Sequence, residues 1–152
     1  MLSLILHAVA GTIVTALALY MNRHLLRGGW KGVTPSALEA SYYLIAVASV
    51  AIGWYFNVVY VFSYPGEASW AHYIKLLFTN PAACSGSQDY CFANVLLFPM
   101  WIVSDGPRRG IRWPFLFFIM SLFTSFGFSM ALYLAVQERQ VRWRAAQGVA
   151  HG

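Results

Sequence analysis

Charged residues are scarce in this chain. They make up 10% of its 152 residues, whereas about a quarter is normal for a soluble domain of that size. The sequence also has no Walker loop, no GxGxxG and no HExxH, so it lacks the usual nucleotide and zinc-protease motifs. Its Lys and Arg residues gather at the ends of apolar segments. That pattern is typical of membrane topology and argues against nucleic-acid binding.

Cysteine is almost absent, which limits metal and redox chemistry. Cys84 and Cys91 are the only two, with six residues between them. Two thiols without a neighbouring His make a poor metal site, so we expect no metal. We expect the segment between them to lie outside the cell, where oxidising conditions permit a disulfide. The alternatives are two free thiols or, less favoured, a metal.

Long apolar runs dominate what is present. Twenty apolar residues suffice to cross about 30 Å of hydrocarbon, and four segments approach that length: Leu2–Met21, Ala40–Phe62, Asp89–Ser104 and Trp113–Val136. The third is short and contains Asn94 and Pro99, so it is either a short span or a re-entrant element. The sequence predicts one all-α membrane domain, residues 1–152, with four transmembrane helices.

The distribution of basic residues predicts an orientation. The first and third links hold six Lys or Arg, whereas the link 64–88 and the basic C-terminal tail 139–152 together hold four. With four spans, the positive-inside rule places both termini outside. If the third segment is re-entrant, the tail is inside instead. Either arrangement fits the inner membrane of a bacterium.

Residues 69–78 form an amphipathic pattern that is too short to span. The aromatic and aliphatic side chains recur at helical spacing on one face, with His72 and Lys75 on the other. We expect an interfacial helix. Its membrane anchors are Trp70, Tyr73, Leu77 and Phe78.

Small and polar residues recur every four positions within three of the segments. Such stripes allow helices to approach closely in lipid. The predicted packing residues are Gly11, Thr15, Ser49, Gly53, Asn57, Ser121, Ser125 and Ser129. Asn57 and Asn94 are expected to hydrogen-bond to each other across two helices.

Four polar residues are candidates for chemistry or for structural bonds. His7 lies within the first segment, where an imidazole can ligate a chlorophyll-type pigment or bond a quinone, or simply bond across a helix interface. Glu39, Asp89 and Asp105 are the carboxylates near segment ends, and a buried acid would be a functional candidate. Each also has a structural explanation: Glu39 in a capping box with Ser36, Asp89 at a helix start, and Asp105 in an ion pair with Arg108 or Arg109.

The order of several motifs resembles a known family. Gly53-Trp54-Tyr55-Phe56-Asn57, the Asn80-Pro81-Ala82 loop, Asp89, Trp101 through Asp105-Gly106-Pro107-Arg108-Arg109, Arg112-Trp113-Pro114 and Ala131-Leu132-Tyr133-Leu134-Ala135 occur in the order found in the domain-of-unknown-function 2834 family of small bacterial membrane proteins. The resemblance covers residues 40–140. It implies a membrane fold with usually three spans, to which the first segment is an addition, and it supplies no activity or catalytic residues.

These features predict an accessory, non-catalytic subunit of a bacterial respiratory or photosynthetic complex. Its partners would be other integral membrane subunits and lipids, with a lipid, quinone, carotenoid or chlorophyll-type pigment as the possible bound group. A partner chain is also the expected support of an ordered tail. The alternative is a small membrane enzyme that acts on an isoprenoid or lipid through Glu39, Asp89 or Asp105. A component of an oligomeric transporter is a third hypothesis.

Overall fold

The computed structural model describes residues 2–26 and 34–148, and within these ranges it contains helices and no strand. The helices are α1 (Leu2–Met21), η1 (Arg23–Leu25), α3 (Ala37–Ser63), α4 (Trp70–Leu77), α5 (Pro81–Cys91), η2 (Phe92–Leu97), α6 (Phe98–Arg109), α7 (Phe115–Phe123) and α8 (Phe126–Ala146). The all-α prediction is confirmed. Arg27, Lys31 and residues 149–152 of the predicted tail lie outside the described residues.

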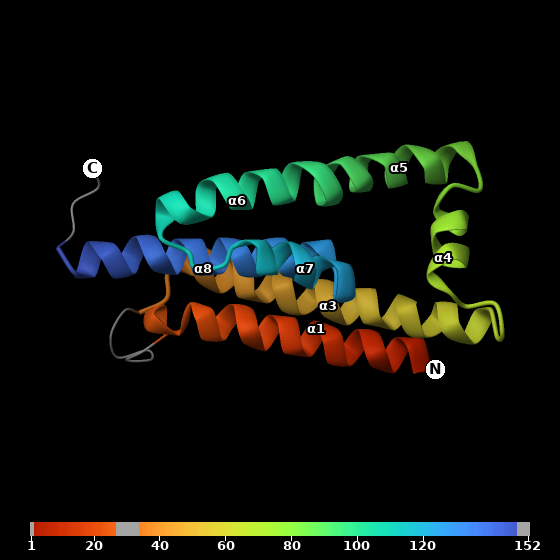
Figure 1. The fold of residues 1–152 in the computed structure, drawn as a ribbon, viewed down its shortest axis with the longest axis horizontal. Coiled ribbons are helices and arrows are strands. Elements are labelled where there is room, and N and C mark those ends of the chain that lie inside the picture. Colours follow the sequence, from red (N-terminus) through yellow and green to blue (C-terminus); the bar gives the residue numbers. More distant parts are fainter. Residues whose placement is uncertain (1, 27–33, 149–152) are drawn as a thin grey trace.

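Two helices, α1 and α3, are long and apolar enough to cross a membrane. Only 11% and 6% of the residues in their apolar stretches are buried. A core helix of a soluble protein would be mostly buried, so these helices present their apolar side chains to the surroundings. Figure 1 shows them running along the long axis of the molecule, at one side of it.

Helix α4 crosses the end of the bundle, nearly at right angles to the other helices (Figure 1). It occupies the predicted interfacial segment. Ser69 caps it, because its hydroxyl accepts a hydrogen bond from the backbone N–H of His72 at 3.2 Å. We call this end of the bundle the α4 end.

The third segment is much longer than predicted. α5, η2 and α6, of 11, 6 and 12 residues, form one continuous helical rod of about 43 Å at ~1.5 Å per residue. Residues 80–87, which were expected to belong to the link 64–88, are therefore helical: Asn80 caps a helix that has Pro81 in its first turn. The predicted end at Ser104 is also wrong: the helix continues to Arg109, and Gly110 closes it in a left-handed conformation.

The rod contains a π-helical turn, η2, directly before Pro99. Proline lacks an N–H and its ring clashes with the carbonyl four residues earlier in a regular α-helix. A widened turn at this point lets the helix pass Pro99 without breaking. The same turn holds Asn94, which is buried.

The fourth segment was predicted to be one helix. It is a helical hairpin instead. α7 ends at Phe123, Thr124 leaves the helical conformation (φ −116°, ψ −96°), and Ser125 caps α8. Phe117 of α7 contacts Ser129 and Tyr133 of α8, which shows that the two helices are antiparallel. In Figure 1 α7 runs from the end of α6 toward the α4 end, and α8 returns.

The hairpin forms the core of the bundle. Phe117, Met120 and Tyr133 are completely buried, together with Ile102 of α6, and α8 packs most extensively on α3 while α7 packs on α1. Helix α8 continues through Ala146, so residues 139–146 of the predicted tail belong to α8. The tail is held by its own chain, and the inference that a partner must order it is not needed.

Candidate functional site

The polar residues at the end opposite α4 form two ion pairs. In the first, Arg139 Nη1 of α8 donates to Glu39 Oε1 of α3 at 2.7 Å, and Arg139 Nε donates to the carbonyl oxygen of Leu25 at 3.1 Å. The Glu39 side chain is fully buried. Ser36 caps α3 through the Glu39 N–H, as predicted, but the Glu39 carboxylate turns to Arg139 and does not complete a capping box.

The second ion pair joins α6 to α8. Arg109 Nε donates to both oxygens of Asp105 at 2.8 Å, and the Tyr133 hydroxyl donates to Asp105 Oδ2 at 3.1 Å. With its amide oxygen turned toward the guanidinium, Gln137 accepts from Arg109 at 2.8 Å. Arg109 is one of the two partners expected for Asp105. This carboxylate is therefore neutralised within the chain.

The three carboxylates do not share a site. Asp89 does not begin a helix, as was expected; it lies on the exposed surface of α5, where its Oδ1 accepts from Gln88 Nε2 at 2.8 Å. Glu39 and Asp105 have separate arginine partners. Within the described ranges no group of His, Cys, Asp and Glu is arranged to hold a metal ion. The geometry offers no paired acids for general acid catalysis.

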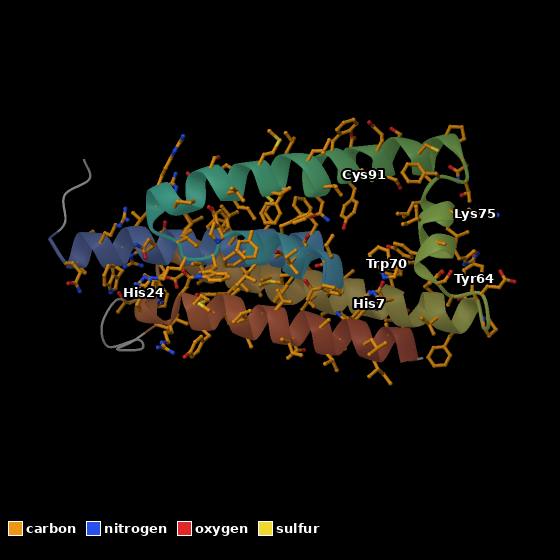
Figure 2. The ribbon with its side chains drawn as sticks, in the orientation of Figure 1. His7, His24, Tyr64, Trp70, Lys75 and Cys91 are labelled. Carbon is orange, nitrogen blue, oxygen red and sulfur yellow. The ribbon has the colours of Figure 1, made fainter. Side chains whose placement is uncertain are left out.

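His7 lies where α1, α4 and the hairpin tip meet (Figure 2). Its Nε2 accepts a hydrogen bond from Trp70 Nε1, and its ring centroid is 5.5 Å from that of Trp70 and 5.9 Å from that of Phe123. A pigment or quinone would have to displace Trp70 from this nitrogen. The role of His7 in cofactor binding stays a prediction.

The remaining face of α4 packs on the end of α3. His72 Nδ1 is 3.0 Å from the Tyr60 hydroxyl, and its ring centroid is 4.8 Å from that of Tyr64. His72 therefore contacts protein and does not share an exposed face with Lys75. Of the predicted anchors, Trp70, Tyr73 and Phe78 are exposed and Leu77 is half-buried.

The predicted packing stripes meet at the hairpin tip. Ser49 and Ser125 hydroxyls lie 2.9 Å apart. A Cβ on Gly11 would come within 2.8 Å of Thr124 Cγ2, and one on Gly53 within 3.6 Å of Ser125 Cβ. The stripes therefore bring α1 and α3 against the tip of the hairpin.

The other stripe residues differ in what they contact. Ser121 donates to Asn94 Oδ1 at 2.8 Å, and Ser129 donates to the Phe117 carbonyl. Asn94 Nδ2 donates to the Tyr90 hydroxyl, so the expected pair with Asn57 is wrong. Thr15 bonds back to its own helix.

A shallow groove of about 430 Å³ lies between α1 and α3 beside the hairpin tip. Its lining is mainly apolar, and its hydroxyl groups already form hydrogen bonds. Those of Thr12, Thr15 and Thr124 all donate to backbone carbonyls four residues earlier. The residues lining it are Ala8, Gly11, Thr12, Thr15, Ala16, Leu19, Val50, Trp54, Thr124 and Phe128.

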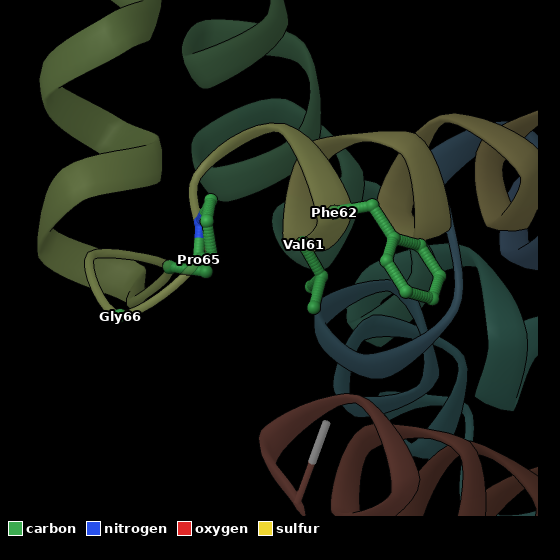
Figure 3. A pocket seen from close by; sticks show the side chains of 5 residues that line it. Val61, Phe62, Pro65 and Gly66 are labelled. Atoms are coloured by element: carbon green, nitrogen blue, oxygen red, sulfur yellow. The ribbon is translucent and has the colours of Figure 1, made fainter.

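A second depression, of about 390 Å³, lies where α3 ends, at Val61, Phe62, Pro65, Gly66 and Ala68 (Figure 3). Neither hollow is lined by a titratable residue.

The predicted disulfide is absent. Cys84 and Cys91 are both free and lie on one helix, α5. Seven positions along an α-helix separate two Cα atoms by about 10.5 Å, and a disulfide requires less than about 7 Å. The interpretation assumed a flexible loop, and the helix that replaces the loop removes the bond.

Two structural residues were missed from the sequence. Asn22 is buried after the end of α1, and its side chain bonds both the N–H (2.9 Å) and the carbonyl (3.0 Å) of Arg112. Gly127 allows α8 to approach α3 closely, since a Cβ there would lie 2.4 Å from Ser49 Oγ. The position of Gly127 beside the serine stripe is the only feature of the sequence that indicates this close approach. Nothing in the sequence indicates the two bonds from Asn22 to the Arg112 backbone, which we call the Asn22 clamp.

The comparisons with known proteins bear on the region from α3 to most of α8, which contains the Asp105–Arg109 ion pair. No curated protein and no solved structure matches the chain significantly. One family model does match, over residues 41–139, which is well over half of the chain. The protein therefore belongs to the family described as "Protein of unknown function DUF2834".

Proposed function

We propose that this protein crosses the bacterial inner membrane three times, through α1, α3 and the α5–α6 rod, and that the α7–α8 hairpin is re-entrant. Broken helices at membrane depth are tolerated where protein surrounds them. The hairpin tip meets that condition, because Gly11 and Ser49 from the middle of α1 and α3 pack on it.

The charge distribution supports this topology. The end of the bundle opposite α4, which we call the basic end, carries Arg23, Arg108, Arg109, Arg112, Arg139, Arg142 and Arg144. Of the Lys and Arg residues that the structure describes, Lys75 alone lies at the α4 end (Figure 2). The positive-inside rule then puts the basic end, and with it the end of α8, in the cytoplasm.

Thiol labelling tests this placement. In a chain lacking Cys84 and Cys91, Thr79→Cys and Gln147→Cys introduce exposed thiols at the two ends. A membrane-impermeant maleimide added to intact cells should label Thr79→Cys alone. The four-span arrangement expected from the sequence puts both positions outside, so labelling of both would restore it.

Within that membrane, the protein acts as a non-catalytic accessory subunit of a larger complex, respiratory or photosynthetic. The observation that carries this proposal is the internal neutralisation of two acids: the buried Glu39 by Arg139 and the partly buried Asp105 by Arg109. Acid catalysis on an isoprenoid needs a carboxyl that is poised beside the substrate. Neither carboxyl borders the groove or the depression, so the enzyme hypothesis has less support.

The groove between α1 and α3 is the place where we expect a transmembrane helix of the partner to pack. Ala8, Thr12 and Ala16 line it at four-residue spacing, which lets two helix backbones approach closely. Because its hydroxyls already donate within their own helix, it offers few groups to orient a polar ligand. A helix of small residues fits this chemistry.

Gentle extraction of the tagged full-length protein from its own organism, followed by identification of co-purifying chains, tests the proposal. Ala16→Leu fills the groove, whereas Ala51→Leu adds the same bulk to an exposed position of α3 outside it. The partner should be lost from the first variant and kept by the second. A bound lipid without any partner chain would favour the enzyme hypothesis instead. Equal recovery of the partner with both variants would exclude the groove as the partner's binding site.

A further inference from the structure

The Asn22 clamp places two arginines from distant parts of the chain on adjoining stretches of backbone. Arg23 directly follows Asn22, and the Asn22 side chain holds the backbone of Arg112 through both its N–H and its carbonyl. Both arginine side chains are exposed. Since Asn22 is 1% exposed, the clamp is a rigid part of the basic end.

Neither arginine forms an ion pair with the residues that the structure describes. Among the residues that the structure describes, the acids of the basic end that form ion pairs do so with Arg109 and Arg139, and no ion pair involves Arg23 or Arg112. These two side chains therefore carry charge that is available to an anion from outside the chain.

Each arginine is accompanied by an exposed aromatic ring. The Arg23 guanidinium lies 4.1 Å from the centroid of Tyr20, which is itself exposed. Trp113, beside Arg112, is also exposed, and it has a φ of +54°, the one positive φ of a non-glycine residue in the described ranges. That conformation is costly for a bulky side chain, and it occurs next to the clamp. Tyr and Trp prefer the depth of lipid headgroups.

We propose that Arg23 and Arg112 bind the phosphate of an anionic phospholipid in the cytoplasmic leaflet, with Tyr20 and Trp113 at headgroup depth beside it. Charge complementarity selects this occupant, because the basic end faces a leaflet rich in anionic lipid. The guanidinium groups supply charge-assisted hydrogen bonds to the phosphate oxygens. The proposal rests on the membrane placement above and is independent of the partner complex.

The test uses the purified full-length protein in nanodiscs made of equal parts phosphatidylglycerol and phosphatidylcholine, with retained lipid measured by mass spectrometry after mild detergent transfer. The wild type should retain phosphatidylglycerol preferentially. Arg23→Gln and Arg112→Gln should each lower the preference about fivefold. This is the change in binding constant expected from the attraction of one basic residue to an anionic membrane surface. Both changes are at exposed positions, so the fold should survive.

Lys75→Gln removes one positive charge at the α4 end and serves as the matched control, with an unchanged preference expected. Added inorganic phosphate at constant ionic strength should not displace the lipid. An unaltered preference in the Arg23→Gln/Arg112→Gln double variant would overturn the proposal, as would an equal loss in Lys75→Gln. Displacement by inorganic phosphate would show a site for free phosphate and would also overturn it.

Discussion

Glu39 of α3 and Arg139 of α8 form a salt bridge of 2.7 Å in which the carboxylate side chain is 0% and the guanidinium side chain 7% exposed. The two residues are separated by most of the chain, and their contact fixes the end of the core hairpin against α3. Arg139 also bonds the Leu25 carbonyl. One guanidinium thus joins three segments.

Glu39→Gln should destabilise the protein by about 3–5 kcal/mol, because it leaves the buried Arg139 charge without a counter-ion. A capping box by itself would tolerate this change, since glutamine can replace glutamate there. Chemical unfolding in detergent, followed by circular dichroism, measures the difference. Glu39→Leu combined with Arg139→Met should recover most of the loss; a double variant as unstable as Glu39→Gln would contradict this account.

Gly11→Ala should destabilise the fold by about 1–3 kcal/mol, because the new Cβ meets Thr124 and the Phe123 backbone at the hairpin tip. Gly86→Ala is the matched control. Nothing lies within 4 Å of its Cβ position, so alanine should stabilise α5 by about 0.5–1 kcal/mol. The same unfolding measurement applies, and equal effects of the two changes would refute the close approach.

Tyr133→Phe should cost about 1.5–3 kcal/mol, since it removes a hydrogen bond to the charged Asp105 and changes little else. The ring packs against Phe98, Trp101 and Phe117, and phenylalanine preserves those contacts. Phe117→Leu removes ring contacts without touching Asp105 and separates packing from hydrogen bonding. A Tyr133→Phe protein as stable as the wild type would show that Arg109 alone satisfies the carboxylate.

Cys84 and Cys91 should both react with iodoacetamide in the denatured protein without prior reduction. Intact mass spectrometry should show two added groups, because the helix α5 keeps the thiols apart. Prior reduction is the control and should leave the mass of the alkylated protein unchanged. A product without added groups would show that the thiols bridge and that α5 is not helical there.

The sequence predicts α1, α3 and α4 well because each has a continuous pattern that local physics controls. Long apolar runs set the first two, and a period of 3.6 residues with Ser69 as cap sets the third. The Gly, Ser and Pro residues in α5 favour a loop by composition. Asn80 followed by Pro81 is nevertheless a helix start, and that signal should have outweighed the composition.

The hairpin and the ion pairs depend on tertiary contacts that one sequence does not display. Thr124 and Ser125 lie inside an apolar run whose proline, Pro114, is ten residues earlier and whose glycine, Gly127, falls inside α8, so nothing local requires a break at this point. The break is stabilised from outside by Gly11 and Ser49. The partners of Glu39 and of Asn22 are likewise far away in the chain, whereas Asp105 and Arg109, four residues apart, could be paired by spacing.

The position of the hairpin has a consequence for how the protein is made. α1 and α3 are synthesised first, yet they contact each other little and pack mainly on α7 and α8. The core is therefore the last part of the chain to leave the ribosome. Until Tyr133 and Arg139 arrive, the earlier helices have neither their packing surface nor their counter-charge, so a nascent chain that stops before Phe115 should remain open to proteolysis.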